Sequence, residues 1–277
     1  MYKLGWFATS RGQTSRKLLE AVLSSIRHGD TPAEIEFVFS NREPGEGENS
    51  DRFFEMVSAA NIPLVSFSSR RFKAEEGAKY PGTADGLPAW RREYDRAAMQ
   101  RLAGFTPDLC VLAGYMLIVG REMCQRYKML NLHPAEPGGP AGTWQEVIWQ
   151  LIEAGASRAG AMMHLVTPEL DKGPPVTYFT FPIRGEPYDR HWQEISGRPV
   201  AGIIREQGEE NTLFKLIRAG GVVRELPLVV ATVRAFSEGR VAITEDGRVV
   251  DAAGQPISAY DLSAEIDRMI TETPETA

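Results

Sequence analysis

Residues 107–114 read PDLCVLAG, the most continuous apolar run in the chain. A strand in the middle of a parallel sheet is covered on both faces, so it reads as an unbroken apolar run rather than an alternating one. Cys110, inside the run, is most simply a small buried hydrophobe. The stretch therefore predicts a central strand of an α/β sheet.

Strands and helices are predicted to alternate on both sides of this run. The expected strands are residues 3–8, 34–41, 62–67 and 129–134, and the expected helices are residues 16–26, 50–60 and 90–102, followed by a short helix after 114. A β-α-β-α order predicts a parallel sheet with helices on both sides. The predicted fold is an α/β three-layer sandwich with a mostly parallel, Rossmann-like sheet, in which ligands bind at the carboxyl ends of the strands.

The second half of the chain predicts a different mixture of elements. Thr143 and Glu146 form a capping-box pattern at the start of a helix. The remaining expected elements are two strands within 160–183 joined by TPELDKGPP, a helix over roughly 212–237 and a hairpin over RVAITEDGRVVD. Residues 68–89 are predicted to be a surface loop, residues 184–211 an insertion, a lid or a linker, and the last residues frayed. The expected division is a domain of residues 1–243 followed by a C-terminal hairpin and tail, 244–277.

Composition limits the classes of function. The chain has 277 residues, 43% of them hydrophobic and 25% charged, with a net charge of −6 and a pI of about 5.4. This balance is ordinary for a soluble globular protein and argues against non-specific nucleic-acid binding. The two cysteines, Cys110 and Cys124, form neither a disulfide framework nor a CxxC metal site. The N-terminus lacks a signal-like apolar segment and no run approaches a membrane span of about 20 residues, so we expect a cytoplasmic protein that does not bind membranes.

Three polar residues stand out by position. Asn131 and His133 lie two apart in LNLHP, which places both side chains on one face of a strand. Asp171 lies in a turn rich in Gly and Pro. Two interpretations remain open from the residues alone: the end of a strand beside an ordinary turn, or the lip of a pocket that carries chemistry.

Motifs along nearly the whole chain resemble those of the folate-dependent formyltransferases, most closely the glycinamide ribonucleotide formyltransferases. NLHP (131–134) is similar to the family's Asn-x-His-Pro stretch. The other similar stretches are FVFSNRE (37–43), WRREYDR (90–96), PDLCVLAGYMLIV (107–119), MMHLVTPELDKGPPV (162–176) and LPLVVATVRAFSEGRVAI (226–243). Residues 68–89, 184–211 and the tail are outside the resemblance.

The resemblance implies a reaction. A formyl group would pass from 10-formyltetrahydrofolate to the amine of glycinamide ribonucleotide in de novo purine biosynthesis, through a tetrahedral adduct that carries an oxyanion. The implied catalytic residues are Asn131 and His133, as donors to the oxyanion, and Asp171, which would favour charged His133 and move the amine proton toward N10. His164 would support them. The substrates are small molecules, and the resemblance requires no metal and no covalent intermediate.

The resemblance also implies binding residues. The folate would be bound by Arg91 and by the loop residues Met116, Leu117, Ile118 and Val119. The phosphate of the acceptor would be bound by the loop after the first strand, at residues Arg11, Gly12, Gln13, Thr14 and Ser15. A monomer and a homodimer both remain open.

The acceptor side departs from the family pattern. The loop SRGQTSR (10–16) has one Gly where the family has two, AGGVVREL (219–226) is apolar where the family has an acidic residue near the ribose, and AEPGGPAG (135–142) also differs. The alternatives are therefore a formyltransferase for another amine (a sugar nucleotide or small molecule), a formyltetrahydrofolate hydrolase, or a nucleotide-binding module without activity. Methionyl-tRNA is disfavoured as an acceptor because the chain is acidic.

Overall fold

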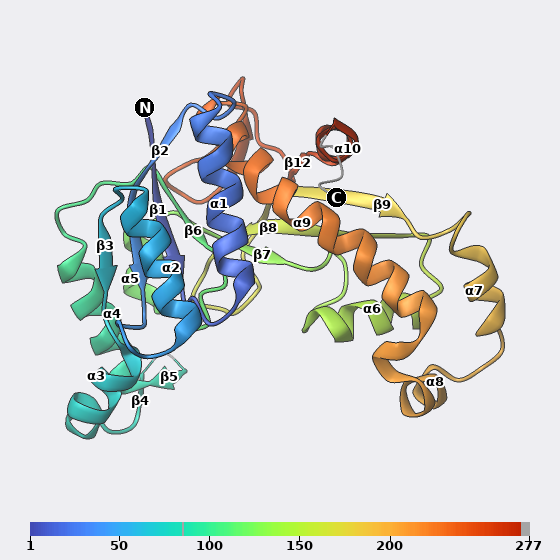
Figure 1. Ribbon diagram of the computed structural model, residues 1–277, viewed down its shortest axis with the longest axis horizontal. Coiled ribbons are helices and arrows are strands. Elements are labelled where there is room, and N and C mark those ends of the chain that lie inside the picture. Colours follow the sequence, from blue (N-terminus) through green and yellow to red (C-terminus); the bar gives the residue numbers. More distant parts are fainter. Residues whose placement is uncertain (85, 273–277) are drawn as a thin grey trace.

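An eight-stranded sheet crosses the whole molecule (Figure 1) in the order β12-β9-β8-β7-β6-β1-β2-β3. The computed structural model describes residues 1–84 and 86–272. The strands of this sheet are β1 (Tyr2–Ala8), β2 (Ala33–Ser40), β3 (Leu64–Ser66), β6 (Leu109–Leu112), β7 (Met129–His133), β8 (Arg158–Leu165), β9 (Pro175–Pro182) and β12 (Tyr260–Asp261). Neighbours are parallel except at β7–β8 and β8–β9, so the predicted mostly parallel α/β sheet is confirmed.

Apolar side chains on both faces of the sheet explain its position between two helical layers. Along β1, Leu4 and Trp6 pack into one core cluster and Phe7 into the other. Gly5 is required between them, because a Cβ there would lie 2.7 Å from both Cys110 Sγ and a Phe37 ring carbon. β6 contributes to both clusters in the same way, as expected for a strand covered on both faces.

The helices divide between the two faces. The first layer includes α1 (Gln13–Arg27), α2 (Glu48–Ala59), α6 (Trp144–Glu153) and the long α9 (Thr212–Ser237), which runs beside α1 (Figure 1). The second includes α4 (Ala89–Arg101) and α5 (Arg121–Arg126). The predicted capping box is confirmed at the start of α6, where Thr143 and Glu146 bond reciprocally.

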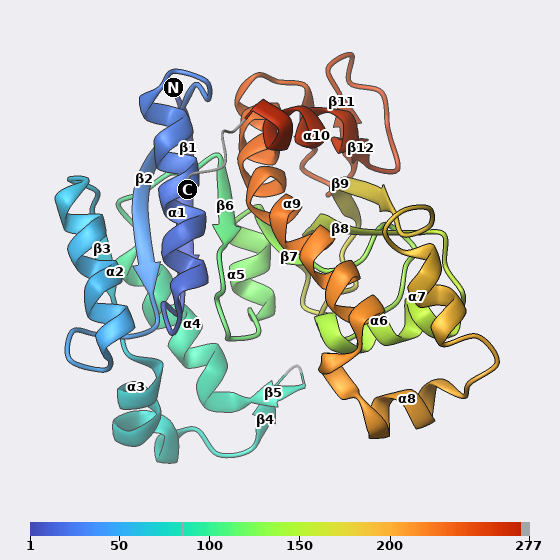
Figure 2. The same cartoon turned by 45° about the vertical axis from the view of Figure 1, so that its right-hand side comes forward.

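Two segments predicted to be loops or insertions contain helices. Residues 68–89, predicted as a surface loop, form α3 (Ser69–Glu76), a short 3-10 turn (Gly77–Lys79) and the small pair β4 (Thr83–Ala84) and β5 (Leu87–Pro88). The loop prediction was wrong because Ser68 caps α3 by accepting a hydrogen bond from Arg71 N–H at 3.0 Å. Residues 184–211 form α7 (Asp189–Glu194), α8 (Val200–Glu206) and a 3-10 turn (Gly208–Glu210), on the side of α9 away from α1 (Figure 2).

The C-terminal residues return to the main sheet. The predicted hairpin is present as β10 (Val241–Ile243) and β11 (Val249–Asp251). Beyond it, β12 pairs with β9, and α10 (Ser263–Glu272), which is absent from the predicted elements, packs on α9. The predicted domain boundary after residue 243 stays a prediction, and the tail predicted to fray lies partly outside the described residues.

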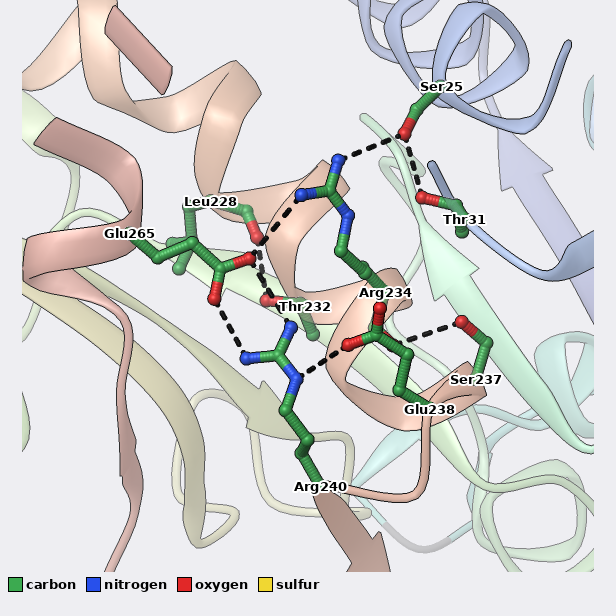
Figure 3. Close-up of polar contacts among 9 residues, drawn as sticks. All are labelled: Ser25, Thr31, Leu228, Thr232, Arg234, Ser237, Glu238, Arg240 and Glu265. Carbon is green, nitrogen blue, oxygen red and sulfur yellow. Dashed lines mark hydrogen bonds and ion pairs between the residues drawn. The ribbon is translucent and has the colours of Figure 1, made fainter. Parts of the chain in front are cut away.

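An ion-pair network attaches α10 to α9 (Figure 3). Glu265 pairs with Arg240 at 2.8 Å and with Arg234 at 3.7 Å, and Arg234 also donates to Ser25 on α1 at 3.4 Å. The Glu265 side chain is only 17% exposed, so water screens these pairs incompletely.

Glu265→Gln is expected to lower the free energy of unfolding by about 1 kcal/mol, because it removes the charge shared by two arginines in a partly buried site. Chemical denaturation measures this change. Glu238→Gln is the matched control, since Glu238 pairs with Arg240 alone at 2.7 Å and its side chain is 38% exposed. Equal losses in both variants would contradict the importance of the shared charge.

Candidate active site

A cavity of about 600 Å³ opens at the carboxyl ends of β6 and β7, between α1 and α9. Its walls come from the β6–α5 connection, the loop after β8, and one side of each of the two helices. Asn131, His164 and Asp171 line it together, although 40 residues separate the first from the last. No residue of 184–211 lines it, so the lid alternative for this segment has no support here.

Asn131 and His164 face each other because β8 runs antiparallel to β7. They are directly paired in the strand register, and Asn131 Nδ2 lies 3.5 Å from His164 Nε2. On the other side of the ring, His164 Nδ1 lies 3.1 Å from the Leu165 carbonyl oxygen, which can only accept. Nδ1 therefore carries the proton, and in neutral His164 Nε2 is an acceptor for the Asn131 amide.

Asp171 completes the cluster. Its Oδ1 lies 3.5 Å from His164 Nε2, so two acceptors face each other unless a proton lies on one of them. The imidazole is buried and the Asp171 side chain is 33% exposed. This arrangement can take up one proton and share it between the two groups.

The backbone that presents Asp171 is strained. Asp171 adopts φ 54°, a left-handed conformation that Asp and Asn tolerate better than other side chains. Two residues later, a Cβ on Gly173 would lie 1.6 Å from the Leu165 carbonyl oxygen, so this position accepts only glycine. The short turn rich in Gly and Pro thus folds back onto β8 and brings Asp171 to His164.

His133 is placed differently from the expectation. Its ring is buried, and its Nε2 lies 3.1 Å from the Pro140 carbonyl oxygen, to which it donates. The ring stands edge-on to His164 with 6.3 Å between centroids, and it is not part of the cavity wall. The Asp171 carboxylate lies against His164, which the register of β7 and β8 places opposite Asn131. That Asp171 acts on His133 stays a prediction.

Burial lowers the pKa of His164 below its ordinary value of 6.5, although the Leu165 carbonyl and Asp171 act in the opposite direction. The imidazole is therefore neutral at physiological pH, and the unfolded chain binds the proton more readily than the folded one.

This depressed pKa predicts a pH dependence of stability. As the pH falls through about 6.5, the unfolded state takes up a proton first, so the free energy of unfolding should decrease until the folded-state pKa is passed. Denaturation between about pH 7.5 and pH 5.5 measures the slope, and His164→Gln should reduce it. An unchanged slope in the variant would show that other groups cause it.

The loop predicted to bind folate lies on the cavity wall. Met116, Leu117, Ile118 and Val119 all line it, with the side chain of Met116 largely exposed. The loop is attached to the residue directly after β1, where Met116 N–H donates to Thr9 Oγ1 at 2.8 Å. Arg91 does not line the cavity; it is buried beneath the loop beside Asp95.

The predicted phosphate loop is only partly on the cavity. Of its five predicted residues Thr14 lines the wall, whereas Arg11 and Gln13 are exposed and Ser15 is buried next to Gly114. Lys17, which the sequence reading missed, also lines the cavity, one helical turn after Thr14. The predicted helix began at residue 16 and left Thr14 outside it, so this i, i+3 spacing became visible only with α1.

Helix α9 contributes a wall that the motifs did not reveal. Arg218, Val222 and Glu225 line the cavity at helical spacing, and Arg218 Nη1 pairs with Glu225 at 2.5 Å. Arg218 also lies over the Trp144 ring, 4.6 Å from its centroid. The stretch 219–226 that was described as apolar therefore does present one carboxylate to the cavity, already paired with a cation.

Two further classes of feature are not found in the part of the chain that the structure describes. Among residues 1–84 and 86–272, no three His, Cys, Asp or Glu side chains are grouped to hold a metal ion. Over the same residues, no helix has both the length and the apolar character needed to cross a bilayer.

The fold is a mostly parallel α/β sheet, and Asn131, His164 and Asp171 lie together at the carboxyl ends of its strands. Residues 11–189 match the model described as formyl transferase, so the chain belongs to that family. It is 28% identical over 246 residues to the phosphoribosylglycinamide formyltransferase of Haemophilus influenzae, covering 87% of this chain and 92% of that protein. The Mycobacterium tuberculosis protein of the same name is 29% identical over 238 residues, with 85% of each chain covered.

Solved structures agree with this fold. Glycinamide ribonucleotide transformylase 1 from Symbiobacterium toebii superposes with a TM-score of 0.55 at 25% identity, covering 88% of this chain and 91% of that one. The phosphoribosylglycinamide formyltransferase of Coxiella burnetii reaches a TM-score of 0.60 at 20% identity, with 94% and 98% covered. At this lower identity the second likeness concerns the fold alone.

Proposed function

We propose that this protein transfers the formyl group of 10-formyltetrahydrofolate to the amine of glycinamide ribonucleotide, a step of de novo purine biosynthesis. The observation that carries the proposal is the meeting of Asn131, His164 and Asp171 on one cavity wall, beside the loop of residues 116–119. The names of the similar proteins from H. influenzae and M. tuberculosis support this acceptor. A cytoplasmic location, and whether the protein is a monomer or a homodimer, stay predictions.

The donor fits the side of the cavity formed by the β6–α5 connection. Met116, Ile118 and Leu170 are apolar side chains exposed at its wall, and they offer contact area for a planar ring system. Backbone groups of the same loop would orient the ring. This side of the cavity would place the formyl carbon next to Asn131.

The reaction needs one donor for the oxyanion and one route for a proton. The amine nitrogen bonds to the formyl carbon, and the carbonyl oxygen takes up negative charge, which the Asn131 amide stabilises by donating a hydrogen bond. Asp171, paired with His164, takes the proton from the amine and passes it to N10 as the bond between N10 and the formyl carbon breaks. His133, predicted as a second donor, would have to release the Pro140 carbonyl to reach the oxyanion.

A second acceptor is favoured by a specific observation. On the wall formed by α9, where the acceptor would bind, Arg218 and Glu225 form an ion pair with each other. Val222, between them in the sequence, is apolar and 40% exposed. A wall of this kind differs from the acidic one implied by the resemblance. An amine other than glycinamide ribonucleotide, with the same formyl chemistry, is therefore the alternative.

One assay separates these functions. Purified protein is incubated with 10-formyltetrahydrofolate, with and without glycinamide ribonucleotide, and loss of the formyl donor is followed. Turnover that depends on glycinamide ribonucleotide supports the proposal. Turnover without an acceptor identifies a hydrolase, and turnover only with other amines rules out the purine acceptor.

A further inference from the structure

Two oppositely charged side chains are buried one turn apart on α4. Arg91 is 5% exposed and Asp95 is 2% exposed, and Arg91 Nη2 donates to Asp95 Oδ1 at 3.0 Å. Neither residue lines the cavity. They lie under the end of the β6–α5 connection, the loop whose residues 116–119 form the cavity wall.

Both charges reach the backbone of that loop. Arg91 Nη2 also donates to the Ile118 carbonyl oxygen at 3.0 Å, and Gly120 N–H donates to Asp95 Oδ2 at 2.8 Å. The carboxylate approaches so closely that a Cβ on residue 120 would lie 2.8 Å from Oδ2, which explains the glycine there. One ion pair thus holds two backbone groups that are two residues apart.

The beginning of the same loop is held by β1 and by Thr9, the residue directly after it. Ala113 N–H donates to the Phe7 carbonyl oxygen at 2.8 Å, and Met116 N–H donates to Thr9 Oγ1, also at 2.8 Å. The loop is therefore fixed to the sheet at one end and to α4 at the other. The span between these attachments carries Leu117 and the side chains around it to the cavity.

A contribution to the stability of the folded protein does not explain why Arg91 and Asp95 are buried together. Burial raises the pKa of Asp95 even though Arg91 acts against it, so the ionised carboxylate is costly at this position. Arg91 Nη1 is buried and has no hydrogen-bond partner among the described residues. Apolar side chains of similar volume often replace such a pair without loss of stability.

We propose that Arg91 and Asp95 are positioning residues that fix residues 118–120, so that the loop presents a pre-formed wall to the formyl donor. This role is additional to the predicted contact between Arg91 and folate, which stays a prediction. It rests on the proposed function for the identity of the donor. The placement of the loop itself does not depend on that function.

The test replaces both charges together, in the variant Arg91→Met/Asp95→Leu. Its melting temperature should stay close to that of the wild type, while amide exchange at residues 117–120 becomes faster. The Kd for tetrahydrofolate and the KM for 10-formyltetrahydrofolate should rise about tenfold, equivalent to 1.4 kcal/mol. The KM for the acceptor should not change, which separates positioning from a general loss of folded enzyme.

The chain offers a matched control in a more exposed ion pair that also starts on α4. Arg96 on α4 pairs with Glu122 on α5 at 2.5 Å, with side chains 42% and 40% exposed, and these two side chains make no recorded bond to residues 115–120. Arg96→Gln/Glu122→Gln should leave amide exchange in the loop and the tetrahydrofolate Kd unchanged. If the two double variants behave alike in both measurements, the positioning role is wrong.

The positioning role can still be tested if the wild type is inactive or if the double variant does not fold. If the wild type forms no product from glycinamide ribonucleotide, amide exchange and tetrahydrofolate binding still decide the role of the pair. If the apolar double variant does not fold, Asp95→Asn, which keeps the volume, is measured instead. Slow, wild-type exchange at Gly120 in that variant would overturn the proposal.

Discussion

Asp171→Asn is expected to lower kcat by about 10²- to 10⁴-fold, the range typical of losing a positioned acid–base group. The substitution keeps the shape of the side chain and removes its ability to accept the amine proton. Asn also tolerates the left-handed backbone at φ 54°, so the loop conformation should survive. Steady-state kinetics at saturating donor and acceptor measure the loss, and the melting temperature should not change.

The control for this variant lies two residues away in the same loop. Glu169→Gln makes the same chemical change at an exposed carboxylate whose recorded ion pair is with Lys172, at 3.4 Å. It should retain a rate close to that of the wild type. Comparable rates in the two variants would show that Asp171 does not take part in the reaction.

Asn131→Ala is expected to lower kcat by about 10²- to 10³-fold, because it deletes the side chain proposed to donate to the developing oxyanion. The KM for the formyl donor should change little, since the amide is needed for charge that appears only in the transition state. Single-turnover measurements of formyl transfer isolate this step from product release.

A second variant at the same position tests the sign of the interaction. Asn131→Asp keeps the size of the side chain but places a carboxylate where the oxyanion forms, so it should be at least as inactive as Asn131→Ala. Activity above that of Asn131→Ala would mean that the side chain does not donate to the oxyanion.

Much of the fold could be predicted because local signals agreed with the long-range arrangement. The apolar run at 107–114 predicted a strand covered on both faces, and β6 is one. Thr143 and Glu146 predicted the start of α6 from three residues of separation. The prediction of a surface loop at residues 68–89 was wrong. It gave more weight to charge, Gly and Pro than to the capping residue Ser68 and the helix-forming residues that follow it.

The site could be predicted only in part, for a physical reason. The resemblance implied Asn131, His133 and Asp171 as catalytic residues and His164 as a supporting one, but their contacts depend on the register of β7 against β8, which no local pattern fixes. For that reason the sequence did not predict the contact between Asp171 and His164. Lys17, Arg218 and Glu225 were missed because each looks like an ordinary surface charge on a helix until α1 and α9 are placed together.

The two ends of the main sheet limit how copies of this protein can associate. Its outermost strands, β12 and β3, have two and three residues, and a strand this short offers few free backbone groups to another chain. Addition of a strand from a second copy would gain little at either edge. Any dimer of this protein should therefore form through the outer surfaces of its helices and loops, which leaves the hydrogen-bonded frame beneath the catalytic residues the same in a monomer and in a dimer.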